Sequence, residues 1–127
     1  MGLSKNFSKS EFECKCGCEM PGDVLENVKE VAKQLQFIRN QVEKPIKINS
    51  AYRCLEHNRS IGSNDTSQHV LGKAADIVIA EFIPIEVKNL LDVFMESGDI
   101  KQGGLGLYNT FVHYDIRGTK VRWDYAK

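Results

Sequence analysis

The chain has 127 residues, a length that predicts one domain. Its composition, 42% hydrophobic and 27% charged, excludes collagen-like, low-complexity and intrinsically disordered proteins. Lysine plus arginine and aspartate plus glutamate each total 17, so the formal net charge is zero. Because a general nucleic-acid binder needs surplus cations to displace counterions, we expect no nucleic-acid partner.

Sequence patterns typical of membrane or secretory segments are missing. No apolar run approaches the roughly 18 residues that span a bilayer. Residues 1–15 are polar and lack the apolar stretch of a signal peptide. We therefore expect residues 1–127 to form a single soluble, monomeric domain that is synthesised in the cytoplasm without a signal peptide and has no membrane anchor.

The first predicted elements are helical. Ser8 and Glu11 fit a capping box, with Phe7 as its hydrophobic staple, which predicts a short helical turn. A second capping signal begins at Asp23. Apolar residues then recur every three or four positions, which predicts a helix over about Val24–Asn40.

Short strands alternate with helices in the rest of the chain. Pro45 precedes a β-type run, and the Ser-, Asn- and Gly-rich residues 57–68 predict a loop. This order predicts an α+β fold in which helices back a small antiparallel sheet. The expected elements are the strand Ile46–Ile48, a helical turn at Leu55–Arg59, the strand Ala74–Ala80, a helix from Pro84 to just before Gly98, and strands at about Gly104–Tyr108 and Phe111–Ile116.

Four cysteines occur, at positions 14, 16, 18 and 54. In a reducing cytosol such a set indicates thiols or a metal site rather than a disulfide framework. The C-x-C-x-C spacing differs from the C-x2-C of zinc knuckles, and Cys54 has no partner near it in the sequence. The spacing therefore favours buried thiols or a redox pair over a structural zinc ion, which stays an alternative.

A second group of residues suggests catalytic chemistry. Asp76 interrupts an apolar run, so its carboxylate must be paired or must bind a metal. His69 can meet Asp76 if the chain reverses at Gly72, and His113 shares a strand face with Asp115. Two histidines and a carboxylate form a catalytic zinc site with an open position for water, whose pKa falls to about 7. A hydrogen-bonded core histidine with a capping aspartate is the alternative.

Three segments carry a resemblance to a known family. Residues 67–76 read S-x-H-x-x-G-x-A-x-D and resemble the signature of the zinc D-alanyl-D-alanine carboxypeptidase-like murein peptidases. Ser50–Arg53 is similar to the S-x-Y-R segment of that family, and Phe111–Asp115 is similar to its F-V-H-x-D strand. The match extends from Phe7 to Trp123. It implies the hedgehog/DD-peptidase fold, in a short form that resembles phage endolysins.

The resemblance also implies roles for individual residues. His69, Asp76 and His113 take the positions that bind one catalytic zinc ion. Arg53 takes the position that grips the substrate carboxylate or the developing oxyanion, which suits a charged planar guanidinium, although a surface ion pair is the alternative. Ser67 would donate a hydrogen bond to the substrate or the metal site. The implied reaction is hydrolysis of an amide bond in peptidoglycan stem peptides or cross-links, at the cell wall after phage-type release.

The chain departs from the family pattern at the general base. Many members have Glu or Asp three residues before the second histidine ligand, where this chain has Thr110. Asp115 would substitute as the catalytic base, or would instead hold the ring of a ligand histidine. His57, in the predicted loop, is a weaker candidate for proton transfer. The alternative functions are a zinc-containing wall- or protein-binding module without turnover, and a cysteine-based metal or redox module.

Some other side chains have two interpretations each. Tyr108 and Trp123 either line a groove for the substrate or belong to the core. Arg117, Lys120 and Arg122 form a basic C-terminal group that either contacts anionic wall polymers or is a solvated face, the latter being favoured.

Overall fold

The computed structural model describes residues 2–126, and its centre is a five-stranded sheet with the strand order β3-β4-β6-β5-β7. Neighbouring strands are antiparallel except β5 and β7, which are parallel. A separate two-stranded sheet joins β1 to β2. The strands are β1 (Gly2–Ser4), β2 (Phe7–Ser8), β3 (Ile46–Ser50), β4 (Ala74–Ile79), β5 (Gly104–Leu107), β6 (Val112–Asp115) and β7 (Val121–Asp124).

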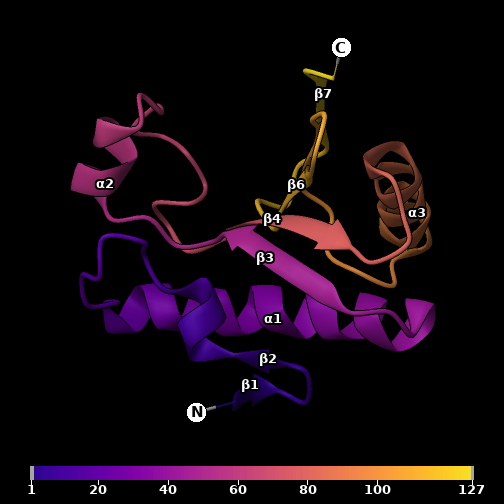
Figure 1. The fold of residues 1–127 in the computed structure, drawn as a ribbon, viewed down its shortest axis with the longest axis horizontal. Helices are drawn as coiled ribbons and strands as arrows, with labels where there is room; N and C mark the ends of the chain where they lie inside the picture. The colour runs from indigo at the N-terminus through magenta and orange to yellow at the C-terminus, as the bar shows by residue number, and fades with distance from the viewer. Residues whose placement is uncertain (1, 127) are drawn as a thin grey trace.

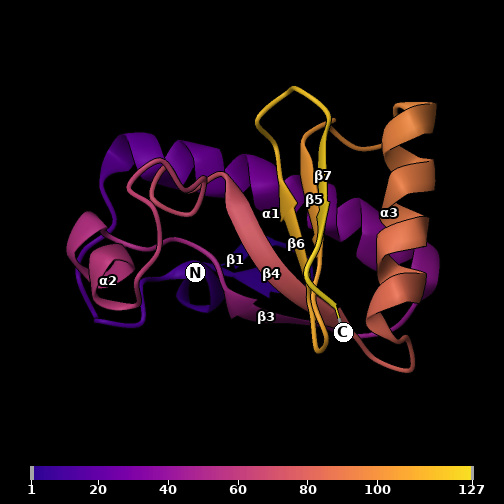
Figure 2. The ribbon, with the colours of Figure 1, turned by 90° about the horizontal axis from the view of Figure 1, so that it is seen from above.

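One helix covers a face of this sheet, and two others lie at opposite ends of the molecule (Figures 1 and 2). The 3₁₀ turn η1 (Lys9–Phe12) leads through a loop to α1 (Gly22–Val42), which runs along the sheet. The short α2 (Leu55–Ser60) and the longer α3 (Pro84–Ser97) lie at opposite ends of the molecule (Figures 1 and 2). Within residues 2–126, every helix is too short or too polar to cross a lipid bilayer.

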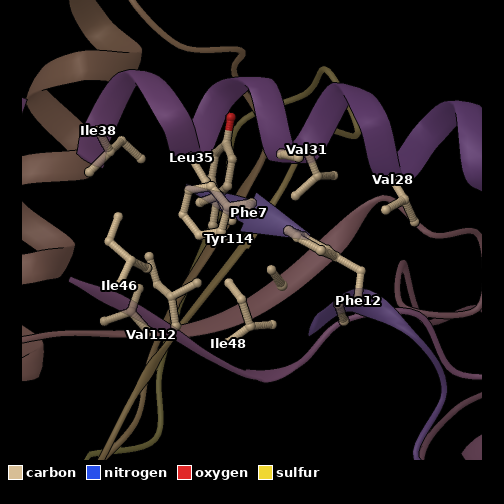
Figure 3. Packing of buried hydrophobic residues seen from close by; sticks show 14 of the residues in the cluster. Phe7, Phe12, Val28, Val31, Leu35, Ile38, Ile46, Ile48, Val112 and Tyr114 are labelled. Atoms are coloured by element: carbon tan, nitrogen blue, oxygen red, sulfur yellow. The ribbon is translucent and has the colours of Figure 1, made fainter. Parts of the chain in front are cut away.

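The core lies between α1 and the sheet (Figure 3). Val31 and Leu35 of α1 face Val112 and Tyr114 of β6, and all four side chains are fully buried. Because side chains alternate along a strand, the residues between these positions point to the opposite face of the sheet. That face carries Asp76, His113 and Asp115, and it is the one that α1 leaves uncovered.

The structure confirms the α+β class, with three α-helices and a mostly antiparallel sheet within residues 2–126. The helix predicted over Val24–Asn40 extends further at both ends. Pro21 precedes its first turn, and Glu43, in the left-handed region, donates its amide to the carbonyl of Arg39 at 3.0 Å. The sequence did not predict β1, β2 or β7. The sheet is mostly antiparallel, as predicted, and the parallel pairing of β5 with β7 is a feature that the sequence did not indicate.

Candidate metal centre

His69, Asp76 and His113 lie together on the sheet face opposite α1. Asp76 of β4 and His113 of β6 are directly paired in the ladder, so their side chains are neighbours. Nε2 of His69 and Nδ1 of His113 each lie 3.2 Å from Oδ1 of Asp76. One ligand atom from each residue lies within 4.8 Å of the other two, and all three residues are buried.

A reversal at Gly72 brings His69 back to the sheet. Gly72 has φ +75°, and its amide donates to the carbonyl of His69 at 3.2 Å. A Cβ atom at this position would lie 2.7 Å from Cγ1 of Val24 and 2.9 Å from its carbonyl oxygen. Glycine is therefore required by both the backbone conformation and the close approach of α1. This is the reversal that the sequence predicted.

The outer nitrogen of each ring is engaged by an oxygen that only accepts hydrogen bonds. Nδ1 of His69 lies 2.6 Å from the carbonyl oxygen of Ala51, and Nε2 of His113 lies 2.7 Å from Oδ2 of Asp115. These outer nitrogens must carry protons, which leaves the inner nitrogen of each ring, the one that faces Asp76, as the atom available to a metal ion. Two ring nitrogens and a carboxylate oxygen that converge in this way could hold a metal ion. The donor set and its outer contacts fit zinc.

The charges of this group depend on one another. Burial alone would raise the pKa of Asp76, but the hydrogen bonds from His113 and His69 outweigh burial and hold that pKa well below its usual range. Burial alone would lower the pKa of His113, and its hydrogen bonds to Asp115 and Asp76 raise it instead. The pocket therefore favours positive charge beside Asp76, which a divalent cation would supply in place of protons.

Asp115 is fully buried, and both of its oxygens are occupied. Oδ1 accepts from the amide of Gly104 at 2.8 Å and from Nε of Arg117 at 2.9 Å. Oδ2 accepts from Nη2 of Arg117 at 2.7 Å as well as from His113. Burial would raise the pKa of Asp115, but the bonds from His113 and Arg117 hold it well below the usual range. The carboxylate is therefore ionised and fixed against the ring of His113.

Arg53 lies in the same pocket, which has a volume of about 410 Å³. Its Nη2 donates to Oγ of Ser67 at 3.4 Å. Its Nε is buried and has no hydrogen-bond partner among residues 2–126. Burial lowers the pKa of this guanidinium, and Asp76 partly offsets that effect. Arg53 lines the pocket, so its charged side chain is placed where it can meet a ligand that carries an oxygen acceptor.

An aromatic wall that the sequence left undecided borders the metal residues. The Trp123 ring lies 4.9 Å from the His113 ring, and its indole nitrogen donates to the hydroxyl of Tyr108 at 3.0 Å. The guanidinium of Arg117 lies 5.7 Å from the Trp123 ring. Sequence reasoning placed Arg117 in a basic surface group and missed its bond to Asp115. The one available signal was the pair of glycines at alternate positions of β5, which leave space on this face.

Several other candidates lie away from the pocket. Neither Thr110, in the exposed turn before β6, nor His57, on α2, lines it. Among the described residues that line it, Asp76 is the one carboxylate. The other two residues of the basic C-terminal group form ion pairs. Lys120 pairs with Glu96 at 2.9 Å, and Arg122 pairs with Asp92 at 2.9 Å.

The chain is similar to a known family over the range that contains these residues. The sequence model of the family described as Peptidase M15 matches residues 5–115. This range contains the His69–Asp76–His113 group together with Arg53 and Asp115, and it ends before β7. No curated protein matches the chain.

Proposed function

The chain belongs to the Peptidase M15 family, and on that basis we propose that it is a zinc-dependent peptidase that cleaves an amide bond in the peptide part of bacterial peptidoglycan. The observation that carries the proposal is the convergence of His69 Nε2, Asp76 Oδ1 and His113 Nδ1 at the pocket floor. Action at the cell wall after phage-type release is part of the same proposal.

The three residues of the buried group would hold the metal. Three protein ligands would leave a fourth zinc position for water or substrate, as in catalytic zinc sites, and all three residues line the pocket. Bound zinc supplies Lewis acidity, which polarises a carbonyl and lowers the pKa of a coordinated water to about 7. The carbonyl of Ala51 and the carboxylate of Asp115 fix the orientation of the two histidine rings, so that the ligand nitrogens need no rearrangement.

Arg53 would bind the negative end of the substrate or the developing oxyanion. Its side chain is held by Ser67 from one side, and its Nε still lacks an acceptor among residues 2–126. A guanidinium presents parallel N–H donors to a carboxylate, such as the terminal carboxylate of a stem peptide. Ser67 therefore acts on the substrate through the position of Arg53.

Asp115 fits the role of a positioning residue better than that of a general base. A base must accept a proton from a group in the pocket, but both oxygens of Asp115 face His113, Arg117 and Gly104 inside the protein. This occupancy, with Asp76 as the one carboxylate among the described lining residues, favours a second candidate function. In that alternative the chain binds a wall peptide at the metal without cleaving it.

One experiment separates the two functions. Purified zinc-loaded protein is incubated with peptidoglycan and with a synthetic stem pentapeptide, with and without a chelator, and new amino groups and product masses are measured. We expect cleavage that the chelator abolishes and that zinc restores. His113→Ala should be inactive, whereas His57→Ala, a histidine outside the pocket, should retain activity. Retained zinc and peptide binding with no released amino group would support the binding module instead.

A further inference from the structure

The fold assembles a second group of potential metal ligands, made of Cys14, Cys16, Cys18 and Cys54. The first three lie in the loop between η1 and α1, and Cys54 directly precedes α2. The Sγ atom of Cys14 lies 3.2 Å from that of Cys16 and 3.8 Å from that of Cys54, and Cys16 lies 3.4 Å from Cys54. All four sulfurs lie within 4.8 Å of one another.

These separations are too long for disulfides and suit a tetrahedral ion. A disulfide requires about 2.05 Å between sulfurs, and all four cysteines are free. Tetrahedral zinc with bonds of about 2.3 Å places its sulfur ligands about 3.8 Å apart. We propose that Cys14, Cys16, Cys18 and Cys54 bind one structural zinc ion, separate from the ion at His69, Asp76 and His113.

The local backbone is arranged around the sulfurs. Gly17 has φ +84°, and its amide donates to the carbonyl of Cys14 at 3.0 Å, so the loop turns back and returns Cys18 to the group. The amide of Cys54 donates to Sγ of Cys14, and the amide of His57 donates to Sγ of Cys54, each at 3.4 Å. Such N–H donors stabilise negative charge on thiolates, which four ligands around one divalent ion require.

The sequence favoured unligated thiols because Cys54 has no partner near it in the chain. The partner segment arrives through the fold. The amide of Tyr52 donates to the carbonyl of Phe12 at 3.1 Å, which places the segment 51–54 beside the end of η1, just before the cysteine loop. The C-x-C-x-C loop then supplies three ligands and the distant Cys54 supplies the fourth.

The position of the site indicates its role. Cys54 follows Arg53, whose amide donates to the carbonyl of His69 at 3.0 Å. Ala51, in the same segment, accepts from the ring of His69. An ion with four sulfur ligands has no open position for catalysis, so it would act by fixing the segment that carries Arg53 and orients His69.

The test uses the full chain in which the two histidines of the candidate catalytic site are replaced by alanine. In His69→Ala/His113→Ala protein purified with zinc, we expect one zinc ion per chain by elemental analysis. Replacement by cobalt should give the sulfur-to-metal charge-transfer bands and intense visible bands of a tetrahedral tetrathiolate site. These readouts need no enzymatic activity, so they hold or fail independently of the proposed peptidase function.

A cysteine variant and the wild-type protein complete the test. Cys16→Ser, at the exposed member of the group, should lose this ion while the ion at the histidine site is retained. If this variant does not fold, zinc-edge X-ray absorption of the double histidine variant should still show four sulfur neighbours. Absence of zinc, bound iron, a disulfide in the native mass, or nitrogen and oxygen neighbours alone would overturn the proposal.

Discussion

The two ring nitrogens of His113 contact two different carboxylates. Its Nδ1 faces Asp76, which belongs to the same candidate metal-binding group, and its Nε2 is held by Asp115. A carboxylate behind a ligand histidine fixes the tautomer and makes the ring a better metal ligand. Because Arg117 neutralises Asp115 from the other side, the buried carboxylate stays ionised while it orients the ring.

Replacement of Asp115 by Asn distinguishes a positioning residue from a base. The amide keeps the shape but loses the charge behind His113, so we expect zinc affinity to fall roughly 10- to 100-fold. Added zinc should restore most of the turnover. Zinc titrations and kinetics of Asp115→Asn, beside Asp124→Asn at an exposed carboxylate, provide the measurement. A loss of kcat that saturating zinc does not relieve would mean that Asp115 moves the proton itself.

Replacement of Arg53 by Lys tests the substrate contact. A lysine keeps the charge but loses the planar fork and the Nε donor, so we expect kcat/KM to fall about 10- to 100-fold, corresponding to one strong charged hydrogen bond. Zinc content should not change. The matched variant is Arg59→Lys, an arginine that pairs with Asp65 on the surface outside the pocket. Equal kinetics for the two variants would contradict the assigned role of Arg53.

The residues of the candidate metal-binding group were more predictable than the residues that contact them from behind. Asp76 is conspicuous in the sequence because a carboxylate in an apolar strand needs a partner, and Gly72 indicates the turn that returns His69. The contact between Arg117 and Asp115 is indicated only weakly, by the two glycines of β5, since an arginine near a chain end is most often solvated. The cysteine spacing likewise gave no sign that the four sulfurs lie together, because the proximity of Cys54 depends on tertiary pairing.

At the scale of elements, the pairing of β5 with β7 places a glycine opposite Trp123, the residue of β7 that lines the pocket. Gly106 of β5 is opposite Trp123 of β7, and a Cβ atom on Gly106 would lie 2.3 Å from the indole ring. The missing side chain lets the ring lie against His113. A parallel pair cannot be joined by a tight turn, so β5 and β7 leave no hairpin pattern in the sequence, and β7 was therefore not predicted.

Gly106→Ala should displace the ring and destabilise the protein. Overpacking of this kind costs about 1–3 kcal/mol. The chain has one tryptophan, so its fluorescence reports the environment of Trp123 directly. Urea unfolding followed by this fluorescence gives the emission of the folded state, which reports the position of the ring, and the free energy of unfolding. Gly22→Ala is the control, because a Cβ atom there meets nothing within 4 Å. Unchanged emission and stability in Gly106→Ala would show that the close contact does not exist in solution.

At the scale of the whole molecule, ion pairs connect the helices α1 and α3 to other parts of the fold. Lys101 pairs with Glu30 of α1, and Arg122 of β7 pairs with Asp92 of α3. Burial would raise the pKa of Asp92, but hydrogen bonds from Lys88 and Arg122 outweigh burial and lower it. A carboxyl group whose pKa is lowered by folding adds stability above its unfolded pKa and loses that contribution as pH falls through the folded value.

Asp92→Asn should therefore destabilise the protein by about 1 kcal/mol near neutral pH. The difference from the wild type should shrink as the pH falls below about 4, where the wild-type carboxyl group takes up its proton. Urea unfolding at neutral and acidic pH measures it, with Asp124→Asn as the matched surface variant. A difference that stays constant across this range would exclude the ion pair as its source.

The most direct test of the metal site is diffraction from crystals of the zinc-loaded protein at the zinc absorption edge. We predict an anomalous peak about 2.0–2.2 Å from Nε2 of His69, Oδ1 of Asp76 and Nδ1 of His113, with a further position open to the pocket. A map from zinc-saturated crystals with no peak between these three atoms would contradict the assignment.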